Sequence, residues 1–103
     1  MNIRIIQEGK TNTYKLGEVK GSAFRKFLVA RDVLIEAEKT GDFTVEMFDK
    51  LIDFIVSAFN NQFTADELLD SMDIVDINLL VLEIQKEVDK KTESKMKKLA
   101  STL

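Results

Sequence analysis

The chain has 103 residues and a mass of 11.7 kDa, which suits one domain with one hydrophobic core. Hydrophobic residues make up 45% of it and charged residues 32%, with a net charge of −3, so neither intrinsic disorder nor a general affinity for nucleic acids is expected. The absence of Cys excludes disulfides, thiol catalysis and Cys-ligated metals, and the absence of His removes the commonest general base. Composition therefore predicts a small soluble helical domain that is not an enzyme.

The hydrophobic residues occur in runs too short for a membrane span. The longest runs are of the kind found from Leu79 to Leu82, whereas a helix needs about 20 apolar residues to cross a bilayer. The first residues contain no apolar segment of signal-peptide length. We therefore expect a cytoplasmic protein that does not bind membranes.

The N-terminal segment has the alternating pattern of two short strands. Ile3 and Ile5 alternate with polar neighbours, and so do Tyr14 and Leu16, with a Gly-containing turn between the two pairs. This pattern predicts a β-hairpin over about residues 2–17. Because two strands alone are only marginally stable in water, the hairpin must pack on helices or be flexible.

A first helix is predicted from about Ala23 to Lys39. Ser22 is the expected N-cap and Gly41 the expected C-terminal stop. Helical spacing places five large apolar residues on the side expected to face the core, namely Phe24, Phe27, Leu28, Leu34 and Ile35.

A second helix is predicted from Thr44 to the Asn60-Asn61 pair. Its polar side contains Asp49, Asp53 and Ser57. The wide apolar arc on the opposite side consists of Phe48, Leu51, Ile52, Ile55, Val56 and Phe59.

A short third helix begins with a strong local signal. Thr64 and Glu67 have the spacing of a capping box, in which the hydroxyl accepts a backbone hydrogen bond and the carboxylate reaches back to the cap. Phe63 and Leu68 have the spacing of a hydrophobic staple around that cap. The residues expected to build this turn and cap are Phe59, Gln62, Phe63, Thr64 and Glu67.

The last predicted helix carries more apolar surface than one contact needs. It follows a cap within Ser71-Met72-Asp73 and runs from Ile74 to Val88, with Leu99 as the end of a longer alternative. One apolar stripe consists of Ile77, Leu80, Val81, Ile84 and Val88. A second stripe, about a right angle or more away, consists of Val75, Leu79 and Leu82. Either the helix is surrounded by its own chain, or the second stripe contacts another molecule.

Charge is distributed unevenly along the chain. From Asp42 to Asp76 there are nine acidic residues against one Lys, a net charge of −8, whereas residues 89–103 have five Lys against two acids, a net charge of +3. The two segments are complementary, and such polarity favours a head-to-tail self-association that weakens with salt. The alternative is that both segments are simply solvated helix faces.

The C-terminal segment is basic and poor in apolar residues. Its lysines are Lys90, Lys91, Lys95, Lys97 and Lys98. Only Met96, Leu99 and Leu103 are large and apolar, too few to anchor the segment in a core, although Glu87 with Lys91 and Glu93 with Lys97 have a helix-stabilising spacing.

The expected fold is therefore mainly α. It is a small bundle of about four helices with a short N-terminal β-hairpin and a frayed or disordered basic C-terminal tail. We expect residues 1–88 to form a single domain, followed by a Lys-rich helical or flexible tail at residues 89–103.

No residue pattern indicates catalysis or a cofactor. The acidic residues Asp66, Asp70, Asp73 and Asp76 lack the alternate spacing and turn Gly of a calcium loop, so no metal is expected. The Ser residues have no His partner, and the Gly residues do not form a phosphate-binding loop.

The run from Phe59 to Asp70, Phe-Asn-Asn-Gln-Phe-Thr-Ala-Asp-Glu-Leu-Leu-Asp, has a recognisable form. Together with residues 14–19, the Arg25-Lys26 helix and residues 42–59, it resembles the tail assembly chaperones of siphophages and prophages of Gram-positive bacteria. The resemblance covers roughly residues 12–88 and contains no catalytic signature.

The resemblance implies a mainly helical, non-catalytic protein that binds the tape measure protein, keeps it soluble during assembly and is absent from the finished virion. It also implies a longer form, made by a programmed frameshift, that recruits tail tube subunits. A helix-in-groove contact with a long amphipathic partner needs an apolar surface, so Val75, Leu79 and Leu82 are the candidate binding residues.

Two other functions remain open at this point. One is a self-associating adaptor or regulatory module, which the charge polarity suggests. The other is nucleic-acid binding through the basic tail and the cationic side chains around Arg25 and Arg31; against it stand the acidic middle and the absence of an aromatic stacking motif, so no nucleic-acid partner is expected.

Overall fold

The computed structural model describes residues 1–102, and Leu103 lies outside the described residues. Two strands are followed by four helices in the described chain, which confirms the predicted mainly α fold with an N-terminal hairpin. In chain order the elements are β1 (Asn2–Gln7), β2 (Lys10–Lys15), α1 (Gly21–Thr40), α2 (Val45–Ala58), α3 (Ala65–Ser71) and α4 (Ile74–Thr102).

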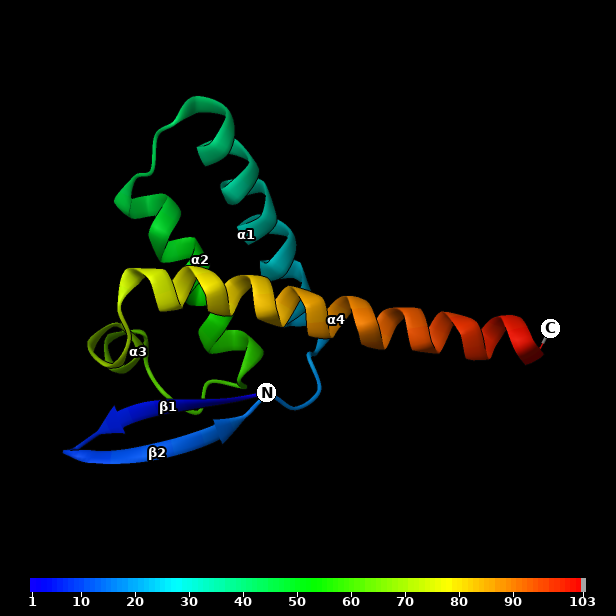
Figure 1. Ribbon diagram of the computed structural model, residues 1–103, viewed down its shortest axis with the longest axis horizontal. Coiled ribbons are helices and arrows are strands. Elements are labelled where there is room, and N and C mark those ends of the chain that lie inside the picture. The colour runs from blue at the N-terminus through cyan, green and yellow to red at the C-terminus, as the bar shows by residue number, and fades with distance from the viewer. Residues whose placement is uncertain (103) are drawn as a thin grey trace.

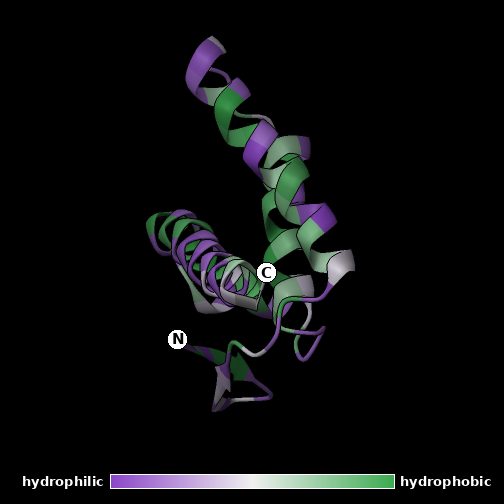
Figure 2. Cartoon of the chain, turned by 90° about the vertical axis from the view of Figure 1, so that its right-hand side faces the viewer, coloured by the Kyte–Doolittle hydropathy of each residue, from purple (hydrophilic) through white to green (hydrophobic). Residues whose placement is uncertain are grey.

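The molecule is flat and open. Helices α1 and α2 pack side by side; α1 projects from one side of α4, α2 crosses behind α4, and the hairpin lies on the other side (Figure 1). A view along α4 likewise shows the α1–α2 pair above and the hairpin below (Figure 2). The extents are 50 × 38 × 20 Å and the radius of gyration is 15.0 Å, against roughly 13 Å for a compact domain of about 100 residues. An open shape leaves much of each helix accessible to other molecules.

The hairpin has the predicted position and a tight turn. Its strands are antiparallel, with Gln7 opposite Lys10, and the two turn residues Glu8 and Gly9 have φ values of 51° and 75°. Both are left-handed, as a two-residue turn between twisted strands requires, and Gly9 adopts this conformation without steric cost. Ile3 and Ile5 are buried, so the hairpin packs its apolar face on the helices.

Helix α1 differs from its prediction at its start. It begins at Gly21 with Lys20 as N-cap, and no side chain caps it, so the assignment of Ser22 as the cap was wrong. The Lys20 carbonyl accepts the Phe24 N–H at 2.9 Å, which places Ser22 inside the first turn. Gly41 ends the helix as predicted, with φ of 75° and its N–H bonded to the Ala37 carbonyl.

The buried side of α1 was also predicted incorrectly. Phe27 is buried as expected, but Phe24 and Ile35 are exposed, and Leu28 and Leu34 are only half-buried. The buried face instead consists of Ala23, Phe27, Ala30 and Val33, in which Phe27 is the one large side chain. The small side chains of Ala23 and Ala30 let α1 approach α2 closely.

Helix α2 is the central element of the core. It packs against α1, α3 and α4. Phe54, which was not among the predicted core residues, is fully buried, and its ring lies 5.6 Å from that of Phe27 on α1. Leu51, Ile52 and Ile55 are buried as predicted; Phe48 and Val56 lie half-buried at the edge of the core.

Helices α2 and α3 begin with the same local device. Thr64 accepts the Glu67 N–H at 3.2 Å while Glu67 accepts the Thr64 N–H at 2.8 Å, which confirms the predicted capping box. At the start of α2, Thr44 accepts the Met47 N–H at 3.2 Å. There too a large apolar residue precedes the Thr cap and another follows four positions after it, with the rings of Phe43 and Phe48 6.1 Å apart.

Helix α4 is long and only partly packed. Asp73 caps it by accepting the Asp76 N–H at 2.8 Å. The first predicted stripe is buried throughout, from Ile77 to Val88. Beyond Val88 the helix continues without a break to Thr102 and extends past the rest of the molecule (Figure 1).

Candidate partner-binding surface

The second apolar stripe of α4 faces solvent. Val75 is 61% exposed, Leu79 51% and Leu82 46%, although the other stripe of the same helix is buried. Isolated apolar residues are common on protein surfaces, but three at helical spacing on one face form a continuous apolar strip. We call these three residues the exposed stripe. The structure thus excludes the first of the two interpretations of the helix pattern, because the rest of the chain does not surround this helix. Contact of the exposed stripe with another molecule stays a prediction.

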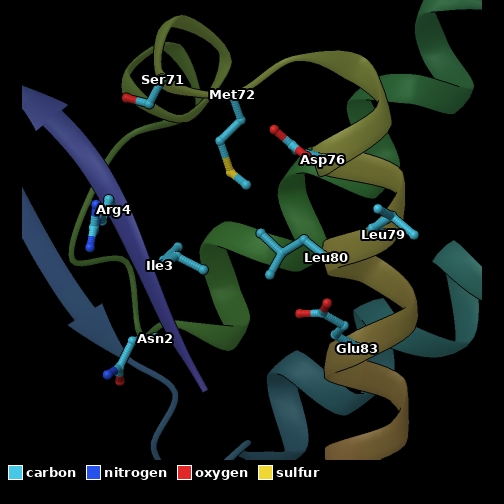
Figure 3. A pocket seen from close by; sticks show the side chains of 9 residues that line it. All are labelled: Asn2, Ile3, Arg4, Ser71, Met72, Asp76, Leu79, Leu80 and Glu83. Carbon is cyan, nitrogen blue, oxygen red and sulfur yellow. The ribbon is translucent and has the colours of Figure 1, made fainter.

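A shallow groove runs beside the exposed stripe, between β1 and α4. Its volume is about 380 Å³, and it is lined by Asn2, Ile3, Arg4, Ser71, Met72, Asp76, Leu79, Leu80 and Glu83. Ile3 and Leu80 point toward one another and form its apolar bottom, while Asp76 and Glu83 project from α4 on the side of β1 (Figure 3). Leu79 belongs both to this groove and to the exposed stripe, so the two features form one continuous surface.

The position of β1 at this groove depends on hydrogen bonds to α3. The Ile6 N–H donates to the Ser71 hydroxyl at 2.8 Å, and that hydroxyl donates to the Glu67 carbonyl at 2.6 Å. The Gln7 side chain donates to the Glu67 carboxylate at 3.1 Å and accepts hydrogen bonds from Asn12 and Tyr14. The hairpin is therefore fixed to α3 by backbone and side-chain contacts at its turn end, whereas the other end of β1 lines the groove.

The pKa of Glu67 in this network is lowered by hydrogen bonds to its carboxylate. The Thr64 backbone N–H and then the Gln7 amide donate to its carboxylate, and these hydrogen bonds lower the pKa of Glu67 below its ordinary value of 4.5. The capping box alone was predicted from sequence. Its carboxylate also anchors the hairpin, because it sits where α3 meets β1.

The predicted turn residues are brought together as expected. Phe59 and Phe63 are buried with their rings 5.6 Å apart, and the Tyr14 ring lies 5.4 Å from that of Phe63. Gln62 is exposed, and its backbone carbonyl accepts from the Gln7 side chain at 3.5 Å. The turn joins α2, α3 and the hairpin in one core, which is a structural role.

The lysines of the tail do not form a single site. Each one is exposed, as is every residue from Asp89 to Ser101. Lys91 donates to the Gly17 carbonyl at 3.1 Å rather than pairing with Glu87, and Lys97 lies 3.9 Å from Glu93 as predicted. Lys91 is thus the residue that ties the start of the tail to the loop before α1.

Three residues of the network that holds the hairpin were missed from sequence: Gln7, Tyr14 and Ser71. Gln7 contacts Glu67 of α3 and Tyr14 contacts Phe63 in the turn before it, while Ser71 of α3 accepts from Ile6 of β1, 65 residues away in the chain. No local pattern records such a contact. The alternation around Tyr14 was a signal of burial, but it did not indicate the partner.

The surface provides apolar contact area, hydrogen-bonding groups at its edge and carboxylates at its rim. Within residues 1–102 no group of His, Cys, Asp or Glu side chains is placed to hold a metal ion, and no helix of that range is long and apolar enough to cross a membrane. A surface of this kind is suited to binding another polypeptide.

The architecture is that of a small helical domain with an N-terminal hairpin and an exposed apolar stripe on its last helix. Residues 1–102 match the family described as phage tail chaperone protein. Because the match spans nearly the whole chain, the protein belongs to the phage tail chaperone family, whose role lies in tail assembly. No curated protein and no solved structure showed a significant match to the chain.

Proposed function

We propose that this chaperone binds the tape measure protein through the exposed stripe and keeps it soluble during tail assembly. The observation that carries this proposal is the exposure of Val75, Leu79 and Leu82 on a helix whose opposite stripe is buried. Family membership supports a protein partner in tail assembly. A long partner helix with its own apolar stripe is a chemical match for such a strip.

The adjoining groove supports the same assignment. A helix laid on the exposed stripe would cover Leu79 and approach Asp76 and Glu83 at the groove rim. Apolar contacts in the middle and charged groups at the edge are the usual composition of a protein interface. The carboxylates favour partner segments that carry Lys or Arg beside their apolar residues.

Co-expression with the tape measure protein tests the proposal. The intact chain should keep that protein in the soluble fraction. A Leu79→Glu, Leu82→Glu variant should not, because binding would bury two unpaired charges in the interface. The matched control is Ile35→Glu, Val45→Glu, which adds the same charges at exposed apolar positions outside the stripe. The proposal fails if the tape measure protein precipitates equally with and without the intact chain.

The finer features implied by the family resemblance form part of the same proposal. A frameshift-extended form of the chain would recruit tail tube subunits, and both forms would act in the bacterial cytoplasm and be absent from the mature virion. Lys pairs such as Lys90-Lys91 and Lys97-Lys98 can be encoded by A-rich codons of the kind on which ribosomes slip. The encoding DNA tests this directly: a slippery heptamer with an overlapping reading frame is expected there.

A further inference from the structure

The projecting part of α4 has little of the packing that usually stabilises a helix. From Asp89 to Ser101 every side chain is exposed, and isolated helices of this length are marginal in water. Met96 is 63% exposed although it is one of the few large apolar residues there. A second surface that packs along this segment would stabilise it.

Charged residues recur every seven positions along one side of α4. They are Asp76, Glu83, Lys90 and Lys97, all of them exposed. Seven residues make nearly two helical turns, so these side chains form a single row beside the exposed stripe. The row is acidic in its first half and basic in its second half. A second copy of the row that runs in the opposite direction therefore places its basic residues beside the acidic residues of the first copy.

Apolar residues follow the opposite side of the exposed stripe. At about 100° per residue, Ile74 near the start of α4 and Met96 and Leu99 near its end lie on that side, and all three are at least half exposed. The helix thus has a charged row on one side of the stripe and apolar residues on the other. Both sets have members near the start of α4 and members near its end.

We propose that two copies of this chain pair through antiparallel α4 helices, so that the tail of each copy covers the exposed stripe of the other. With Asp76 opposite Lys97 of the second copy, the common spacing brings Glu83 opposite Lys90 of that copy. In the same register the apolar side brings Ile74 opposite Leu99 of the second copy, with Met96 next to it. A twofold axis perpendicular to the helices relates both sets of contacts.

The contacts already present in one copy allow this pairing. Among the described residues no ion pair is recorded for Asp76, Glu83 or Lys90, and the Lys97–Glu93 pair within the helix is long at 3.9 Å. Arg4 lines the groove across from Asp76. Because the contact surfaces are identical in both copies, the assembly closes as a dimer rather than extending into a filament.

Sedimentation velocity of three preparations tests the dimer. The intact chain should dimerise in low salt, with a dissociation constant at least about tenfold higher in roughly 1 M salt, where charges are screened beyond about 3 Å. Two double variants should each be monomeric, because each places like charges opposite one another. The first is Lys90→Glu, Lys97→Glu, and the second is Asp76→Lys, Glu83→Lys. An equimolar mixture of the two variants should dimerise again, because both rows are then complementary.

A matched control and two contrary outcomes complete the experiment. Lys10→Glu, Lys15→Glu on β2 changes the net charge as the tail variant does and should leave the dimer intact. An intact chain that stays monomeric in low salt overturns the proposal, and so does a mixture that contains only monomers. Circular dichroism checks that every variant keeps its helix content.

The dimer also has a consequence that rests on the proposed function. If the exposed stripe binds the tape measure protein, the tail of the second copy competes with it, so Lys90→Glu, Lys97→Glu should retain tape measure binding while losing the dimer. The sedimentation experiment contains no other protein. A failure of dimerisation is therefore distinguishable from a failure of tape measure binding.

Discussion

The side-chain amide of Gln7 donates a hydrogen bond to the Glu67 carboxylate across 3.1 Å and ties the hairpin to the first turn of α3. The same carboxylate accepts the Thr64 N–H at 2.8 Å. One side chain thus serves both as a helix cap and as the anchor of a segment 60 residues away in sequence.

The first prediction concerns the titration of Glu67. Its lowered pKa comes first from the Thr64 backbone hydrogen bond and then from Gln7, so Gln7→Ala should move the Glu67 pKa upward, part of the way toward 4.5. Because the Glu67 pKa is lowered in the folded state, the ionised carboxylate stabilises the fold at pH values above its ordinary pKa, and this contribution is lost as the pH falls through the lowered pKa. NMR titration of the Glu67 carboxyl carbon measures the pKa in the intact chain and in the variant. An unchanged pKa in Gln7→Ala would show that the amide does not bind the carboxylate in solution.

Ser71→Ala should loosen the hairpin. The substitution removes the protein acceptor of the exposed Ile6 N–H and should cost about 0.5–1.5 kcal/mol in the free energy of unfolding. Chemical denaturation measures the loss, and hydrogen exchange of the Ile6 amide should accelerate more than that of residues in α2. Ser94→Ala in the exposed tail is the matched control and should change stability little. Equal stabilities of the two variants would contradict the role assigned to Ser71.

Phe54→Ala should be among the most destabilising single substitutions. The side chain is fully buried between α1 and α2, so its removal creates a cavity and should cost about 3–5 kcal/mol. Phe24→Ala is the control, because Phe24 is 41% exposed although sequence periodicity had placed it in the core. Urea denaturation of both variants gives the comparison. A larger loss in the Phe24 variant would mean that α1 presents its other side to α2.

Thr64→Ala and Thr44→Ala compare the two helix starts. Each removes a hydroxyl that accepts a backbone N–H at 3.2 Å and should cost about 1 kcal/mol. The Thr64 variant should lose more, because Glu67 loses a partner of its capping box and also holds Gln7. Thermal denaturation measures the order of the two values, and the reverse order would contradict the coupling between the cap and the hairpin.

Removal of residues 89–103 tests the proposed domain boundary. Every described side chain from Asp89 to Ser101 is exposed, so the shortened chain should keep its fold, with a melting temperature within about 4 °C of the intact protein at low concentration. The Lys91 contact with Gly17 is the described hydrogen bond from the tail to the body that the truncation removes. Loss of cooperative unfolding would place the tail inside the folding unit.

Local sequence patterns predicted the element types well and the packing less well. The hairpin, the Gly41 stop and the Thr64–Glu67 capping box depend on interactions within a few residues, and all three are present. The buried side of α1 could not be predicted in this way. Phe24 and Phe27 are the same residue type, and only contact with α2 decides which of the two is buried. The small residues Ala23 and Ala30 were overlooked for the same reason: close helix packing favours them, but their own apolarity is slight.

By itself the sequence determined the secondary structure, the charge polarity and the presence of two apolar stripes on the last helix, because periodicity and capping act over one or two turns. Tertiary structure decided which stripe is buried and which is exposed. It also decided that β1 and α4 enclose a groove, and that Gln7 and Ser71 hold the hairpin in place. Burial depends on which distant segments meet, and that choice lies in the packing of the whole chain rather than in any one segment.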